Sequence, residues 1–242
     1  MKYLLLILFI SLPQISSAKN WNEIQEELIN YNYLDTKALK GLKCIATSET
    51  ISRMSRQIEQ TKSKHFKIAL LDENIRVGIN SELEFFVDHP SLAVEGISDK
   101  AKGNPNLVKN VSAKISDSFR TITDMFHNGL EQIKVKTKSS FPEGTNNLSF
   151  KENSLTYSVQ TEKENYEVKE LYFSSTAYKG NIETISILLN SEGNAPTETS
   201  FKYSYQTLES GIIFPNKITY TFSDLSNNKK MQMVLDIGHC NL

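Results

Sequence analysis

The sequence is poor in the residues that metal centres, redox sites and nucleic-acid binders depend on. Among 242 residues there are two cysteines, four histidines and one tryptophan. The 27 basic residues are matched by 28 acidic ones, which gives a net charge of −1 at pH 7. Because there is no basic excess to neutralise phosphates, we expect no nucleic-acid partner. No break in composition divides the chain, so we expect one domain. No repeat of fixed period and no low-complexity tract stands out.

Signatures of catalysis and of metal or cofactor binding are also missing. The sequence has no H-E-x-x-H, no P-loop, no G-x-G-x-x-G, no calcium loop and no G-x-S-x-G. The histidines are not spaced as metal ligands would be on one helix or strand; they are His65, His89, His127 and His239. We therefore expect no enzyme, no catalytic residue, no metal and no cofactor. A hydrolase remains the least favoured alternative, with His239 and Cys240 as a conceivable nucleophile pair if the thiol is free.

Long apolar runs are limited to the N-terminus. Lys2 precedes the uncharged run Leu4–Leu12, and Ser16-Ser17-Ala18 supplies the small residues of a cleavage site. The run is about half the roughly 20 residues that a membrane-spanning helix needs. We expect a cleavable signal peptide over 1–18, a single α+β domain over 19–242, and a periplasmic or secreted protein without an integral membrane segment. A buried N-terminal helix is the alternative.

The two cysteines, Cys44 and Cys240, lie near opposite ends of the expected mature chain. In an oxidising compartment such a pair is typical of a disulfide. Closing a loop of this length is worth roughly 4–5 kcal/mol on the chain-entropy account, less any strain. Two buried free thiols are the alternative. Neither cysteine belongs to a C-x-x-C pair, which argues against a dithiol redox centre.

Helical spacing dominates the first half of the chain. Apolar residues at three- and four-residue steps predict a helix over 21–31. A second short helix is expected to carry Leu39 and Leu42, after which 43–48 is extended. Residues 49–60 fit a strand or a short helix equally well. Alternation between Phe66 and Val87 then favours strands.

One long helix is predicted after these strands. Asn104 is a good N-cap and Pro105 suits the first helical position. The apolar positions that follow form one stripe: Val108, Val111, Ile115, Phe119, Ile122, Phe126, Leu130 and Ile133. A helix of this length must lie across a sheet or along a groove.

After Lys134 the pattern changes to alternation. Six consecutive segments carry apolar residues at every second position, and turn formers separate them. They centre on Tyr157, Val168, Ile187, Tyr203, Tyr220 and Met233. One apolar and one polar face are typical of an antiparallel sheet. The predicted fold is α+β: an antiparallel meander sheet or half-barrel packed on a long amphipathic helix, plus short N-terminal helices.

Large apolar side chains gather in the last three of these segments. They are Phe201, Tyr203, Tyr205, Tyr220, Phe222, Met231 and Met233. Packing against the long helix is the favoured interpretation. The functional alternative is a lining for an apolar ligand, because a curved sheet covered by helices can enclose a cavity, and methionines pack adaptably around irregular guests.

The order of elements resembles the superfamily of bacterial periplasmic lipoprotein carriers (LolA/LolB-like) and their relatives. The resemblance rests on the helix expected over 21–31, the early strands, the helix within an antiparallel meander, and the stretch Ser210–Ile218 (SGIIFPNKI) that runs into a strand. It implies an incomplete β-barrel whose helices cover a cavity for acyl chains. The carriers gate that cavity with an arginine; Arg76 lies in the corresponding region, but no role is transferred to it. The two cysteines and the length of the middle helix depart from the family.

These observations lead to two functional hypotheses. The first is an exported, monomeric, non-enzymatic protein that binds or carries a lipid-like ligand, such as a lipid or a lipoprotein acyl chain. The second is an envelope structural or interaction protein that acts through an exposed sheet face or edge. Lys134, Lys136 and Lys138 could belong to such a face, although lysines also protect edge strands from aggregation.

Overall fold

The computed structural model describes residues 36–60, 63–72, 74–134, 145–151, 154–160, 165–173, 181–190 and 195–242. The expected signal peptide and the helix expected over 21–31 lie outside these residues. No helix among the described residues has the length and hydropathy needed to cross a bilayer.

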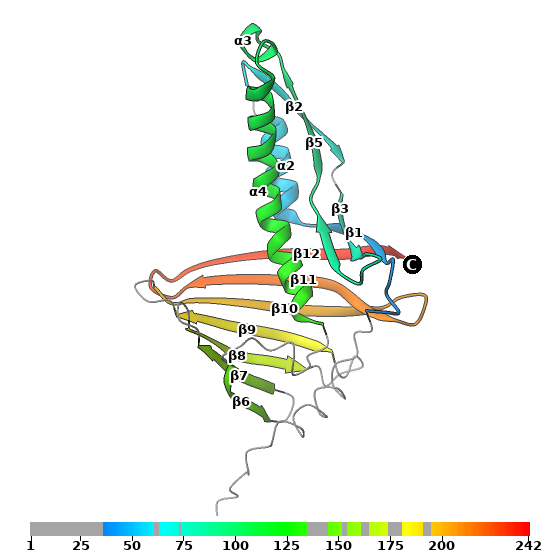
Figure 1. Ribbon diagram of the computed structural model, residues 1–242, viewed down its shortest axis with the longest axis vertical. Coiled ribbons are helices and arrows are strands. Elements are labelled where there is room, and N and C mark those ends of the chain that lie inside the picture. The colour runs from blue at the N-terminus through cyan, green and yellow to red at the C-terminus, as the bar shows by residue number, and fades with distance from the viewer. Residues whose placement is uncertain are drawn as a thin grey trace, which may run out of the picture.

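A meander of seven antiparallel strands forms the body of the protein and curls into a half-barrel (Figure 1). Each strand pairs with the next one in the sequence, as the alternating pattern predicts. The strands are β6 (Thr145–Lys151), β7 (Ser154–Gln160), β8 (Asn165–Phe173), β9 (Ile182–Asn190), β10 (Thr197–Thr207), β11 (Ile213–Asp224) and β12 (Lys229–Asn241). The predicted meander is confirmed, with β6 added at its start.

Three early strands extend this sheet beyond β12. They are β1 (Lys43–Thr47), β3 (Ile75–Ile79) and β4 (Phe85–Asp88), and all their pairings are antiparallel. The resulting ten-stranded sheet has the order β4-β3-β1-β12-β11-β10-β9-β8-β7-β6. The first and last strands of the described chain, β1 and β12, are therefore neighbours in the sheet.

The long helix α4 (Pro105–Gln132) has the predicted boundaries. The side chain of Asn104 accepts a hydrogen bond from the backbone N–H of Leu107 at 3.2 Å and so caps the first turn. Every buried residue of the helix lies in its C-terminal half, from Phe119 to Leu130. The C-terminal half therefore packs against the sheet, whereas the N-terminal half extends beyond it (Figure 1).

The N-terminal half of α4 belongs to an arm that projects from the sheet (Figure 1). The arm also contains α2 (Glu49–Gln60), the two-stranded ribbon of β2 (Phe66–Asp72) and β5 (Ser91–Gly96), and α3 (Asp99–Lys102). Residues 49–60, for which the sequence allowed a strand or a helix, are helical. On both ribbon strands the side chains alternate between half-buried and exposed.

The short helix expected around Leu39 and Leu42 is wrong. Residues 36–41 form turns, although both leucines are fully buried. The segment hydrogen-bonds to β3 instead: Gly41 N–H donates to the Ile79 carbonyl, and Ile79 N–H donates to the Leu42 carbonyl, both at 3.0 Å. A Cβ on Gly78 would lie 1.9 Å from the Leu42 oxygen, so this close approach requires glycine.

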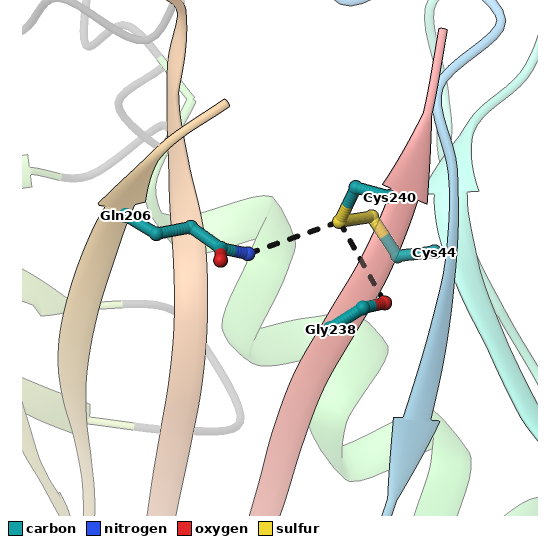
Figure 2. The surroundings of a disulfide bond; sticks show 4 residues. All are labelled: Cys44, Gln206, Gly238 and Cys240. Carbon is teal, nitrogen blue, oxygen red and sulfur yellow. Dashed lines mark hydrogen bonds between the residues drawn. A yellow bond between two sulfur atoms is a disulfide. The ribbon is translucent and has the colours of Figure 1, made fainter. Parts of the chain in front are cut away.

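The predicted disulfide between Cys44 and Cys240 is present, with a Cα–Cα distance of 4.0 Å (Figure 2). It joins the neighbouring strands β1 and β12, where the register shifts and His239 has a φ of 47°. The Cys44 side chain is buried, and Gln206 Nε2 lies 3.8 Å from the Cys240 sulfur. The bond therefore ties the strands that carry the arm to the last strand of the meander.

Candidate apolar ligand site

A row of large side chains crosses the sheet where α4 packs on it. The strand register aligns Phe201 with Tyr220 and Tyr220 with Met233, so all three share one face. Their exposed fractions are 4%, 6% and 4%, and the rings of Phe201 and Tyr220 are 5.4 Å apart. We call these three residues the closed row, because they belong to the buried core.

Gly129 brings the helix into direct contact with the closed row. A Cβ at this position would lie 2.8 Å from Cδ1 of Phe201. The hydroxyl of Tyr203 donates a hydrogen bond to the Gly129 carbonyl at 2.8 Å. The absence of a side chain on the helix is therefore what allows the Phe201 ring to pack against its backbone.

The tyrosine hydroxyls of β10 are satisfied inside the protein. The Tyr205 hydroxyl donates a hydrogen bond to the carbonyl of Ile182, as the Tyr203 hydroxyl does to that of Gly129. Loss of hydration raises the pKa of both phenols well above their usual value. Burial also raises the pKa of Tyr220, against an opposing hydrogen bond with Thr199. The three phenols are therefore neutral near pH 7 and pack in the core.

A second row on the same face is less covered. The register aligns Ile187 with Thr199, Thr199 with Phe222, and Phe222 with Met231. Ile187 and Phe222 are partly buried against the core, whereas Met231 is 41% exposed. We call these four residues the open row. Of the seven residues predicted as a lining, five are thus core residues, and Phe222 and Met231 lie in the open row.

Cross-strand pairs of apolar residues continue from β9 into β8 and β7. Ile187 pairs with Val168, and Val168 pairs with Tyr157. In the neighbouring row, Ile185 is buried and pairs with Leu171. The apolar positions therefore extend over more strands than those that contact α4.

The four histidines do not assemble into a site. His65 Nδ1 lies 2.9 Å from Ser98 Oγ in the arm, and His89 Nδ1 donates to the Pro90 carbonyl while its ring stacks on Phe119. His127 Nε2 lies 3.5 Å from Glu131, and His239 is exposed beside the disulfide. Within the described ranges, no three His, Cys, Asp or Glu side chains are grouped to hold a metal ion.

Arg76 and Lys134, which the sequence analysis singled out, both form ion pairs. Arg76 on β3 forms an ion pair with Asp72 at 2.7 Å, and its side chain is 65% exposed. Lys134 follows α4 instead of lying on a strand; it pairs with Glu131 at 2.7 Å and lies over the ring of Phe85. The sheet-face role considered for Lys134 is therefore wrong, and Lys136 and Lys138 lie outside the described residues.

Two grooves lie away from the aromatic rows. One, of about 600 Å³, runs along the arm between Val94 of β5 and the N-terminal half of α4. The other, of about 260 Å³, lies beside Cys240 and the C-terminal Leu242. Neither is lined by residues of the open or closed row, so the arm and the C-terminus are separate from the candidate site.

Ile187 and Thr199 are the members of the open row that the sequence did not single out. Ile187 is part of a predicted alternating strand, but the row depends on cross-strand register, which one sequence does not show. Comparison with known proteins adds no assignment: no family model matches the chain, and neither a curated protein nor a solved structure shows significant similarity to it.

Proposed function

We propose that this protein is an exported, non-enzymatic binding protein that holds a lipid-like apolar ligand on the sheet face against which α4 packs. The observation that carries the proposal is the open row. Helix α4 seals the closed row, but the adjacent row on the same face leaves Met231 41% exposed. An acyl chain laid along this row would remove apolar surface from water, which is the main driving force for binding such ligands.

The strand pairing of the open row supports the proposal. The row continues in register through β9, β10, β11 and β12. A binding surface held on paired strands is preorganised, so less ordering free energy is lost on binding. A disulfide is also typical of proteins outside the cytoplasm, where lipid carriers cross an aqueous space.

The second hypothesis, an envelope interaction protein, is favoured by a different feature. The arm carries α3 and the half-exposed part of α4 away from the sheet, and Leu71 on β2 is 70% exposed. Such a projection can contact a partner without covering the sheet. A pull-down from envelope extract that recovers a specific partner with the full chain, and loses it with Leu71→Glu, would support this function.

Ligand titration with matched variants tests the proposal. We expect the purified domain to bind a fluorescent long-chain fatty acid, measured by the rise in its emission, and Met231→Glu to weaken binding about tenfold. The exposed part of Met231 contributes about 1 kcal/mol when covered, and a carboxylate beside the chain adds a desolvation cost. Leu71→Glu is the control, because it places the same charge at an exposed apolar position on the arm.

Equal binding by the two variants and the wild type would show that the chain does not lie along the open row. Absence of binding by the wild-type protein itself would remove the proposal.

A further inference from the structure

The open row is part of a longer line of positions that crosses the sheet. From Ile187 on β9, direct cross-strand pairs continue the line to Val168 on β8 and Tyr157 on β7. The register shifts in these strands lie outside the line, so its pairing is unbroken. We call the six positions the transverse line: Tyr157, Val168, Ile187, Thr199, Phe222 and Met231. None of them carries a charge, as a site for an alkyl chain requires.

The transverse line is bordered on both sides along the strands. On one side lies the closed row, on which α4 packs through Gly129. On the other side, the next positions of β10, β11 and β12 on the same face are polar: Thr197, Asp224 and Lys229. Successive residues on one face of a strand are about 6.7 Å apart, which leaves width for one alkyl chain but not for two. A chain bound here therefore runs across the strands.

Thr199 does not interrupt the line for such a chain. Its side chain hydrogen-bonds with the hydroxyl of Tyr220, which belongs to the closed row. Because the hydroxyl of Thr199 already has a partner within the protein, a chain that covers it leaves no polar group unpaired.

The spacing of the strands sets the length of the line. Neighbouring strands lie about 4.8 Å apart, so the five steps from β12 to β7 span about 24 Å. With a C–C bond of about 1.5 Å, an extended alkyl chain gains about 1.25 Å per carbon. The line therefore matches an extended chain of about 18–20 carbons.

We infer that the ligand is a single extended acyl chain of about 18–20 carbons that lies across the strands along the transverse line. The inference rests on the proposed function and adds the number, direction and length of the bound chains. Each added carbon then covers more of the line until its end is reached, after which further carbons extend into water and contribute little.

A series of fatty acids of increasing length tests the inference. Dissociation constants would be measured from about 8 to about 22 carbons by displacement of a fluorescent fatty acid. In the wild type we expect binding to tighten about twofold per carbon, because roughly half of each methylene is covered, and to level off at about 18–20 carbons. Native mass spectrometry at saturation should show one fatty acid per protein molecule.

Met231→Glu shortens the apolar line by one strand, which corresponds to about four carbons. Chains of up to about 12 carbons fit on the remaining positions and should bind this variant as they bind the wild type. Chains of about 18–20 carbons should bind it about tenfold more weakly, and the levelling-off should move to about 16 carbons. Gln232→Glu is the control, because it adds the same charge at the adjacent exposed position on the opposite face; it should match the wild type at every length.

Three results would overturn the inference, and they differ in what they leave standing. If Met231→Glu weakens binding of every chain length by the same factor, or if affinity rises throughout the series without levelling off, the chain does not run across the strands, although an apolar site remains. Two fatty acids bound at saturation would refute the single chain. If no fatty acid binds the wild type, the proposed function fails and the inference fails with it.

Discussion

Replacing Gly129 by alanine tests how closely α4 packs on the sheet. In an exposed helix interior, alanine is more stable than glycine by about 0.8–1.0 kcal/mol. Here the new Cβ would lie 2.8 and 2.9 Å from two ring atoms of Phe201. That ring is 4% exposed and is held between Tyr203 and Tyr220, at centroid distances of 6.4 and 5.4 Å, so it has little room to move.

Overpacking of a core by one methyl costs about 1–3 kcal/mol, which exceeds the gain in helix propensity. We therefore expect Gly129→Ala to lower the free energy of unfolding by about 1 kcal/mol, measured by urea denaturation with the disulfide intact. Asn128→Ala is the control: its position is exposed on the same turn, so only the propensity gain of a few tenths of a kcal/mol should be seen.

A second background isolates the contact. In Phe201→Leu the ring is gone, so Gly129→Ala should become neutral or stabilising, and the two effects should differ by about 1–2 kcal/mol. If Gly129→Ala stabilises the wild type as much as it stabilises Phe201→Leu, the helix does not pack on the closed row. The division into a closed and an open row would then have no basis.

Three further predictions concern the frame of the fold. Cys44→Ser/Cys240→Ser should lower the free energy of unfolding by roughly 4–5 kcal/mol in urea, because the bond closes a loop with a sequence separation of 196; an unchanged midpoint would contradict this. Burial raises the phenol pKa of Tyr203 and Tyr205 above the unfolded value near 10. The free energy of unfolding should therefore keep its full value below pH 10 and fall above it by about 1.4 kcal/mol per pH unit for each tyrosine. Urea unfolding at pH 10 to 12 should show a shallower decrease of this free energy with pH for each Tyr→Phe variant, and an identical decrease would be evidence against burial. Asn104→Ala should lower the stability of α4 by about 1 kcal/mol, because it removes the N-cap hydrogen bond. Amide hydrogen exchange should accelerate mainly in the first turns of the helix, where no helix residue is buried. A uniform acceleration along the helix would argue against a separable arm.

Local signals in the sequence were sufficient for the elements with strong periodicity. The N-cap at Asn104 and the eight-position stripe predicted α4 because capping and helical spacing act within a few residues. The strands of the meander followed from two-residue alternation between turn formers. The disulfide could be proposed because the sequence offers two cysteines, and their pairing has no competitor.

Elements that depend on distant partners were not predictable in the same way. The segment around Leu39 has helical spacing, but its backbone hydrogen-bonds to β3, and Gly78 makes room for it. The projecting arm was missed because half-exposed apolar residues on α4 and the β2–β5 ribbon have the same pattern as buried ones.

The candidate site was predicted only in part for the same reason. The sequence identified large apolar residues on β10, β11 and β12, but it could not separate those beneath α4 from those beside it. That distinction depends on register and on Gly129, which permits close packing of the helix over Phe201.

Native mass spectrometry of the protein purified without detergent from the periplasm of an expressing bacterium tests the central claim most directly. The account predicts a fraction of molecules that carry the added mass of an acyl lipid, released by organic solvent and diminished in Met231→Glu. A single unliganded mass that stays unchanged after incubation with fatty acid would contradict it.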